Sequence, residues 1–210
     1  PGREGEGDFI ASAKKIDPEW MKFILDTARG AFIAIFMPEE EAIRFDLPEQ
    51  VVRSENQESS RTNFRLTVDS SYAHSGCTAA ERAQAANILG GVFKPYETIN
   101  NNKPFHYENG DLELRDSTKE DLVRPGHVVP IVGNPGGLHK RQGHTETGIE
   151  LMKLANINPP VAVDMEILDP NDPYKMASPE YLRTIADKFD LKLISTSMVC
   201  ERLGIEEIKY

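Results

Sequence analysis

The sequence has few cysteines and no long apolar run. Its two cysteines, Cys77 and Cys200, form no CxxC pair, a pattern that indicates a disulfide-free protein of a reducing compartment. The longest apolar run, Ala31 to Pro38, is too short to span a bilayer, and no signal peptide is recognisable. These absences predict a soluble cytoplasmic protein.

Basic residues are also scarce. The chain has 24 Lys and Arg against 34 Asp and Glu, a formal net charge of -10. Nucleic acids and anionic membranes require a basic face, so both are disfavoured as partners. A small phosphorylated ligand is still possible, because a few arginines can bind it locally. The length of 210 residues and the hydrophobic content of 39% are typical of one globular domain, which we expect over residues 1–210.

The sequence alternates between helical and strand-like patterns. Helices are predicted over 17–30, 78–90, 145–154, from 178 onward, and over 197–203. Strands are predicted over 31–37, 64–69, 128–132, 161–168 and 191–194. This alternation indicates an α/β (α+β) domain with a mixed sheet covered by helices.

One long segment has no sustained periodicity. Residues 94–122 are polar and rich in Asn, Asp and Glu. A loop of this length inside a domain is usually functional or mobile. We expect an insertion loop over 94–122, either a lid over a functional site or a surface insertion without a chemical role.

Two short motifs combine arginine, carboxylates and glycines. They are Arg3-Glu4-Gly5-Glu6-Gly7-Asp8 and Arg141-Gln142-Gly143-His144-Thr145-Glu146. Arginine binds phosphate bidentately, a predicted helix start provides anion-binding N–H groups, and carboxylate with histidine suits a divalent metal. If the fold joins the motifs, they form a metal-assisted site for a phosphorylated substrate. Otherwise His144 is a hydrogen-bonded structural residue and the first motif a solvated acidic turn.

Two further residues are open to both a structural and a functional interpretation. Glu166 stands among apolar neighbours in a predicted strand, where a carboxylate needs a partner or a raised pKa, and this favours a functional role. His127 either has a chemical role or only begins a strand. Cys77, in a Gly-Cys-Thr-Ala turn, is expected to be a packing residue rather than a nucleophile.

Four ordered segments together resemble a known family. They are Arg3-Glu4-x-Glu6-Gly7-Asp8, Ser75-Gly76-Cys77-Thr78-Ala79-Ala80-Glu81-Arg82, Arg124-Pro125-Gly126-His127 and Arg141-x-Gly143-His144-Thr145-Glu146. The chain resembles 3,4-dihydroxy-2-butanone 4-phosphate synthase, a family of riboflavin biosynthesis. Residues 160–168 and Met176-Ala177 extend the likeness to nearly the whole chain.

The resemblance implies a homodimeric lyase with active sites at the subunit interface. It implies conversion of D-ribulose 5-phosphate to formate and 3,4-dihydroxy-2-butanone 4-phosphate with Mg²⁺ or Mn²⁺. By motif position, Glu4 and His144 would be the metal ligands. His127, Glu166 and Glu6 would be the catalytic groups, with His127 reaching the partner's site. The implied substrate contacts are Arg3, Glu4, Asp8, Thr78, Arg141, Gln142, Gly143, His144 and Thr145.

The chain also departs from the family pattern. Ile33 and Val132 stand where a cysteine and an arginine are usual, the connection from Arg82 to Arg124 is longer, and a segment is expected upstream of Pro1. These departures leave a second reading open, a diverged relative that acts on another substrate or is a non-catalytic binding or regulatory homodimer. The retention of Glu4, His127, His144 and Glu166 favours an enzyme.

Overall fold

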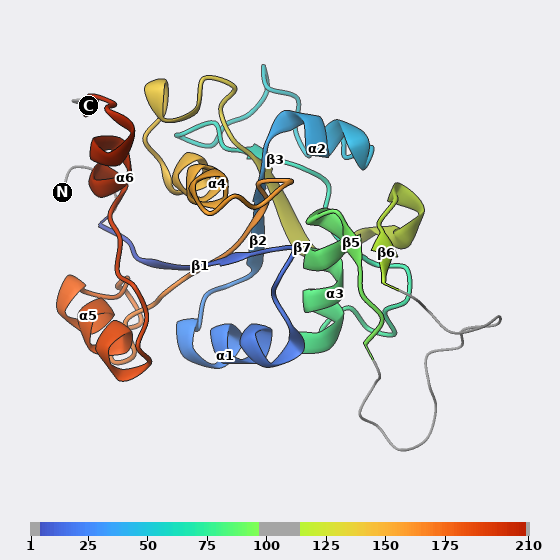
Figure 1. Cartoon of the computed structure of the whole chain (residues 1–210), viewed down its shortest axis with the longest axis horizontal. Helices are drawn as coiled ribbons and strands as arrows, with labels where there is room; N and C mark the ends of the chain where they lie inside the picture. The colour runs from blue at the N-terminus through green and yellow to red at the C-terminus, as the bar shows by residue number, and fades with distance from the viewer. Residues whose placement is uncertain (1–4, 97–113, 209–210) are drawn as a thin grey trace.

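A mixed six-stranded sheet forms the centre of the molecule (Figure 1). The structure is a computed structural model that describes residues 5–96 and 114–208. The strand order is β1-β8-β2-β7-β3, with β4 also paired to β7. The strands are β1 (Asp8–Ser12), β2 (Ile33–Met37), β3 (Asn63–Phe64), β4 (Val68–Ser70), β7 (Leu122–Val132) and β8 (Ala162–Glu166). Strands β2 and β7 are parallel, and the other pairs of this sheet are antiparallel.

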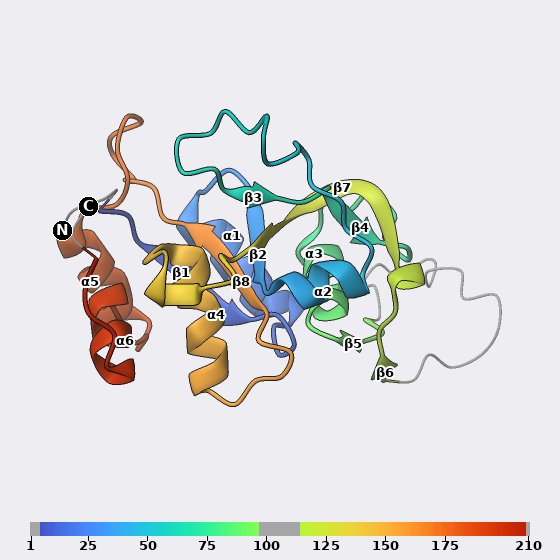
Figure 2. The same ribbon diagram turned by 90° about the horizontal axis from the view of Figure 1, so that it is seen from above.

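Helices cover both faces of this sheet (Figure 2). Helices α1 (Pro18–Ala28) and α3 (Ala79–Leu89) pack on one face, and α4 (His144–Leu154) packs on the other. Helices α5 (Pro179–Lys188) and α6 (Thr196–Leu203) lie beyond the β1 edge, and α2 (Glu39–Arg44) follows β2. The predicted mixed sheet covered by helices is therefore confirmed. None of the helices in the described part of the chain is long and apolar enough to span a membrane.

Side-chain caps explain where several helices begin. Asp17 accepts a hydrogen bond from the N–H of Trp20, and Ser178 accepts one from the N–H of Tyr181. Thr78 forms a reciprocal capping box with Glu81. These are the cap positions predicted from the sequence, because each has a short polar side chain directly before a helical pattern.

Strand β2 separates two layers of the core. Ile33, Ile35 and Met37 belong to the main cluster under α1 and α3, whereas Ala34 and Phe36 belong to a smaller cluster under α4. Every residue of the strand is buried. Burial on both faces explains why its sequence is a continuous apolar run rather than an alternating one.

Some predicted elements differ from the structure. The strand predicted over 191–194 is wrong: the segment is irregular, and the N–H of Leu191 bonds the carbonyl of Ala186 at the end of α5. The strand predicted over 64–69 is two short strands, β3 and β4. Helix α4 begins at His144 with Gly143 as its cap, two residues before Thr145, which was the expected cap. Strand β1 and helix α2 were not predicted.

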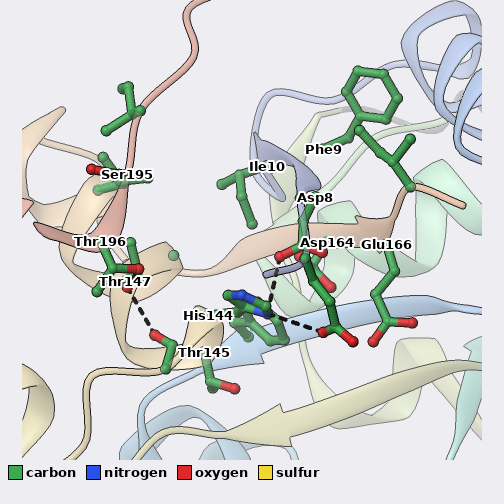
Figure 3. A pocket seen from close by; sticks show the side chains of 18 of the residues that line it. Asp8, Phe9, Ile10, His144, Thr145, Thr147, Asp164, Glu166, Ser195 and Thr196 are labelled. Atoms are coloured by element: carbon green, nitrogen blue, oxygen red, sulfur yellow. Dashed lines mark hydrogen bonds and ion pairs between the residues drawn. The ribbon is translucent and has the colours of Figure 1, made fainter. Parts of the chain in front are cut away.

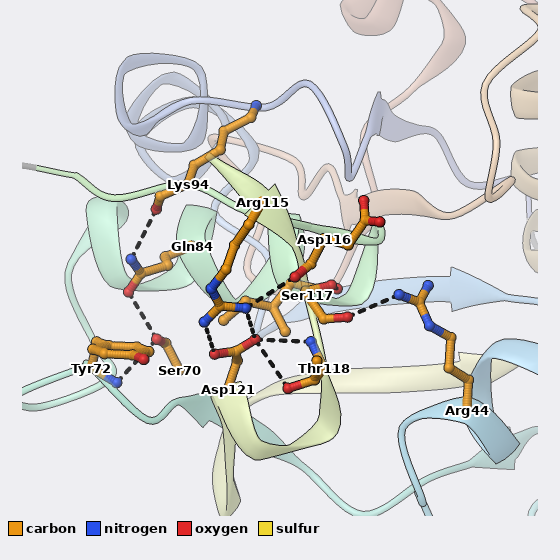
Figure 4. Close-up of polar contacts among 11 residues, drawn as sticks. Arg44, Ser70, Tyr72, Gln84, Lys94, Arg115, Asp116, Ser117, Thr118 and Asp121 are labelled. Carbon is orange, nitrogen blue, oxygen red and sulfur yellow. Dashed lines mark hydrogen bonds and ion pairs between the residues drawn. The ribbon is translucent and has the colours of Figure 1, made fainter. Parts of the chain in front are cut away.

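Contacts with the rest of the domain hold the described ends of the predicted insertion loop in place (Figure 4). Residues 97–113 lie outside the described part of the chain. On either side, β5 (Val92–Phe93) pairs with β6 (Arg115–Asp116). The Arg115 guanidinium lies 4.4 Å from the centre of the Phe93 ring and donates to Asp121 Oδ2 at 2.8 Å. Leu122 already belongs to β7. The insertion over 94–122 and the domain boundaries 1–210 stay predictions.

Candidate active site

A pocket of about 760 Å³ opens on the face of the sheet that carries α4. Its walls are formed by the chain from Gly5 to Ile10, parts of β2 and β8, the first turn of α4, the irregular segment 191–195 and the first turn of α6. Figure 3 shows Asp8 of β1 and Asp164 and Glu166 of β8 gathered beside His144 of α4. Segments distant in sequence therefore meet in a single cavity.

The pairing of β1 with β8 gathers carboxyl groups on one face of the sheet. Asp8 lies opposite Glu166 in the antiparallel register, and Ile10 lies opposite Asp164. Directly opposed residues project to the same side, and residues two apart on a strand share a face. Glu6, Asp8, Asp164 and Glu166 all line the pocket. This face is therefore strongly acidic.

His144 joins the second motif to the first. It is the first residue of α4, and its Nδ1 lies 3.1 Å from Asp8 Oδ2 and 4.0 Å from Glu6 Oε2 (Figure 3). Its side chain is 35% exposed, so it is accessible from the pocket. The expected meeting of the two motifs is therefore present for Glu6, Asp8 and His144. Arg3 and Glu4 lie outside the described residues.

Asp164 was not identified from the sequence. It is only 5% exposed, and among the described residues nothing donates a hydrogen bond to its Oδ1. Burial raises its pKa well above the usual value, and the nearby charges of Asp8, Glu166 and Glu6 raise it further. The sequence contained a signal for Asp164, because it is an acidic residue in the middle of the apolar segment 161–168. The sequence-based interpretation singled out Glu166 alone in that segment.

The segment 141–146 is held by internal contacts. Arg141 Nη1 donates to Glu146 Oε2 at 2.9 Å, and Glu146, which is 2% exposed, also accepts the N–H of Asn134 at 2.8 Å. A Cβ on Gly143 would lie 2.7 Å from Arg141 Nη1, so this turn leaves little space for a side chain. Arg141 and the uncapped N-terminus of α4 together present positive charge and N–H groups to the pocket.

Gln142 and Thr145 border the same pocket in different ways. The Gln142 side-chain amide donates to the carbonyl of Glu206 at 2.8 Å and accepts from the N–H of Ile208 at 3.0 Å. It thereby fixes the C-terminal segment against the pocket. Thr145 is 5% exposed and lines the pocket from the first turn of α4.

His127 belongs to a separate pair with Asp69. The pairing of β4 with β7 places Asp69 Oδ2 2.7 Å from His127 Nδ1, and Asp69 Oδ1 accepts the backbone N–H of His127 at 2.9 Å. The His127 side chain is 47% exposed, whereas that of Asp69 is 11% exposed. His127 is not among the residues that line the pocket. Asp69 orients the imidazole and leaves its other edge accessible.

The loop before α3 packs against this pair. Gly76 has φ +76°, and a Cβ there would lie 2.1 Å from Asp69 Oδ2. Glu81, which is 5% exposed, accepts hydrogen bonds from both the backbone and the side chains of the loop. Thr78, a predicted substrate contact, donates its hydroxyl to Glu81 Oε2 at 2.9 Å and does not line the pocket.

The two substitutions that depart from the family pattern lie away from the pocket. Ile33 is fully buried and Val132 is 4% exposed, and both belong to the main core under α1 and α3. Neither lines the pocket, whereas Ala34, the next residue of β2, does. The departures therefore alter the core rather than the walls of the site.

The pocket contains side chains of the kinds that bind divalent cations, namely Glu6, Asp8 and His144. Within residues 5–96 and 114–208, no group of three or more His, Cys, Asp or Glu residues is arranged around a common metal position. The chemistry nevertheless suits a hard cation, because carboxylate oxygens and one imidazole meet in an acidic pocket. A cation would also reduce the repulsion that raises the pKa of Asp164.

Relatives of known sequence carry names from riboflavin biosynthesis. The probable bifunctional riboflavin biosynthesis protein RIBA 1, chloroplastic, of Oryza sativa subsp. japonica is 37% identical over 92% of this chain and 31% of that protein. The riboflavin biosynthesis protein RibBA of Nocardia farcinica is 33% identical over 92% of this chain and 40% of that protein. The chain thus spans between 31% and 40% of the length of these relatives.

Solved structures and a family model agree with this likeness. A 3,4-dihydroxy-2-butanone 4-phosphate synthase in complex with two magnesium ions aligns with a TM-score of 0.77 at 26% identity, over 96% of this chain and 86% of that one. The enzyme of Candida albicans aligns with a TM-score of 0.74 at 27% identity, over 96% and 86%. The family model for 3,4-dihydroxy-2-butanone 4-phosphate synthase matches residues 1–202. The chain therefore belongs to the 3,4-dihydroxy-2-butanone 4-phosphate synthase family.

Proposed function

We propose that this chain is a lyase of riboflavin biosynthesis that converts D-ribulose 5-phosphate to 3,4-dihydroxy-2-butanone 4-phosphate and formate. The observation that carries the proposal is the single pocket in which His144, at the start of α4, meets Glu6 and Asp8. Family membership adds the reaction class. The cytoplasmic location expected from the sequence stays a prediction.

The two ends of the pocket suit the two ends of a sugar phosphate. Arg141 and the N–H groups of Gly143, His144 and Thr145 provide positive charge for the phosphate. The carboxyl groups on β1 and β8 face the hydroxyl-bearing carbons. Glu6 and Glu166 are proposed as acid–base groups, because proton transfers next to a ketone need carboxylates within hydrogen-bonding reach. Arg3 and Gln142 are proposed as further substrate contacts.

A magnesium ion is proposed as the cofactor, with manganese as a substitute. Glu4 and His144 would hold it, at the junction of the two motifs. When bound, the ion would act as a Lewis acid that stabilises negative charge on the substrate oxygens. The related synthase whose structure contains two magnesium ions supports this proposal.

We further propose a homodimer in which His127 serves the site of the partner subunit. Its imidazole is oriented by Asp69, yet it lies outside the pocket that contains His144. Thr78, in the adjacent loop, would reach the substrate in the same way. An oriented and half-exposed histidine apart from the pocket fits a site completed across a two-fold axis.

Formate release tests the reaction. The purified chain, incubated with ribulose 5-phosphate and Mg²⁺, should release formate, and EDTA should abolish the release. A His144→Gln variant should lose both formate release and metal binding, while Tyr174→Phe, at a 93% exposed position outside the pocket, should keep both. Absence of formate from the wild-type chain in metal-containing buffer would reject the proposed reaction.

Mixing two inactive variants tests the shared site. His127→Ala and His144→Ala should each be inactive alone. If each site combines residues of both subunits, one site of each mixed dimer is intact, and random mixing should restore ~25% of wild-type activity. No recovery after denaturation and joint refolding, with mixed dimers verified by mass, would place His127 in the site of its own subunit or in none.

A further inference from the structure

Asp164 stands in the middle of the sheet, and its Oδ1 accepts no hydrogen bond from the part of the chain that the structure describes. It occupies the centre of β8 and lies opposite Ile10 of β1 on one side and Ala34 of β2 on the other. Both neighbours are apolar, and all three residues line the pocket. A central strand position between two apolar side chains ordinarily favours an apolar residue.

The surroundings make this position costly for an ionised carboxylate. Asp164 is 5% exposed, its Oδ1 receives no hydrogen bond from the described residues, and Asp8 and Glu166 are negatively charged neighbours. Buried carboxyl groups that crowd together cannot all ionise, and the most buried one retains its proton. Burial and the charge of Asp8 accordingly raise the pKa of Asp164.

A buried polar group without a partner destabilises a fold. An apolar residue of similar size would therefore be expected to stabilise this sheet more than Asp164 does. A neutral carboxyl group is also a hydrogen-bond donor, which a carboxylate is not. The pocket thus has a neutral carboxyl donor on β8, close to the acceptor oxygens of Asp8 (Figure 3). Its neighbours on the adjacent strands are the apolar Ile10 and Ala34.

We propose that Asp164 is a further ligand-binding residue of this pocket, which donates a hydrogen bond to a hydroxyl or carbonyl oxygen of the bound sugar phosphate. The proposal rests on the proposed function for the identity of the ligand. Asp164 would thus provide a neutral hydrogen-bond donor in addition to the anion-binding groups at the start of α4. The ligand would be oriented by its phosphate at one end and by Asp164 at the other.

Two substitutions separate the roles that Asp164 could have. Asp164→Val removes the carboxyl group and suits a strand. Asp164→Asn is nearly isosteric, neutral at all pH values, and keeps a hydrogen-bond donor. The control is Asp121→Val, because Asp121 is also a buried acid, 3% exposed, but it is paired with Arg115 and lies outside the pocket.

Ribulose 5-phosphate binding is measured by calorimetry in EDTA, thermal unfolding is followed without ligand, and formate release is measured with Mg²⁺. Asp164→Val should weaken binding by ~10-fold or more and raise the unfolding temperature by ~2–4 °C. Asp164→Asn should bind within ~3-fold of wild type. Asp121→Val should lower the unfolding temperature and leave binding unchanged.

Each contrary outcome has a distinct meaning. Wild-type binding by Asp164→Val would refute the ligand contact, and a lower unfolding temperature for that variant would show a structural role instead. Equal loss of binding in Asp164→Asn and Asp164→Val would show that the ionised carboxylate is required, which overturns the donor role. If the wild-type chain binds the sugar phosphate without releasing formate, and Asp164→Val weakens that binding, the proposed reaction fails and the Asp164 contact stands. If it does neither, both fail.

Discussion

The Glu81 carboxylate should make a large, pH-dependent contribution to stability. Burial alone would raise its pKa, but hydrogen bonds from the N–H groups of Ser75, Thr78 and His74 outweigh burial and lower the pKa from 4.5 to about 2. One pKa unit corresponds to about 1.4 kcal/mol, so this interaction contributes about 3 kcal/mol at neutral pH. Because the pKa is lower in the folded state, the contribution is present above pH 4.5 and is lost between pH 4.5 and about 2.

The substitution Glu81→Gln tests this value. Glutamine keeps one acceptor oxygen but places an NH₂ group where Oε2 accepts from the N–H and hydroxyl of Thr78. The variant should lose about 3 kcal/mol at pH 7, which lowers the unfolding temperature of a chain of this size by roughly 6–12 °C. Urea unfolding at pH 7 and near pH 2.5 measures the difference directly.

The difference in the free energy of unfolding between wild type and Glu81→Gln should become smaller as the pH falls. Glu58→Gln is the matched control. The pKa of Glu58 is also lowered to about 2, mainly by a hydrogen bond from the N–H of Ser60. Its carboxylate is exposed, however, so solvent screens the interaction. The control should therefore change stability less. Equal stability of Glu81→Gln and wild type at pH 7, or a gap that is the same at both pH values, would refute the reasoning.

Three further predictions concern the groups around the site. Gly76→Ala, at φ +76° and in collision with Asp69 Oδ2, should lower kcat while circular dichroism stays unchanged; unaltered kcat would mean that the loop does not position the His127–Asp69 pair. Asp69→Asn should reduce kcat by ~10–100-fold with little change in KM, because the neutral amide no longer orients and supports the imidazole; a pure KM effect would argue against this role. Glu146→Gln should weaken phosphate binding by ~5–10-fold, because the carboxylate that holds the Arg141 guanidinium in position is lost. The affinity for inorganic phosphate is measured by calorimetry, and an unchanged affinity would contradict this role of Glu146.

Local signals in the sequence were sufficient for most of the fold. Asp17, Thr78 and Ser178 cap the helices as predicted, since a cap depends only on residues within one turn. The apolar run of β2 was recognised as a strand for a similar reason. The segment 191–194 was predicted wrongly, because its apolar residues form a wall of the pocket between α5 and α6 rather than a strand.

The site was predictable to the extent that each motif carries its own chemistry. The two motifs were expected to meet, and Glu6 and Asp8 of the first lie beside His144 of the second. The predicted pairing of Glu4 with His144 lies outside the described residues and stays a prediction. Asp69 gave no signal, because it is 58 residues from His127 in sequence and only the pairing of β4 with β7 joins them. Contacts of this kind depend on sheet register, which a single sequence does not specify.

The bond between Gln142 and the backbone of 206–208 has a practical consequence for handling the protein. Gly5 and Glu6 line the pocket near one end of the chain, and Glu207 and Ile208 line it near the other. An affinity tag, a fluorescent label or a surface linker attached at Gly5 or at Ile208 would therefore lie beside the pocket. The exposed bend around Glu55 to Ser59 lies outside the pocket lining and is a safer place for attachment.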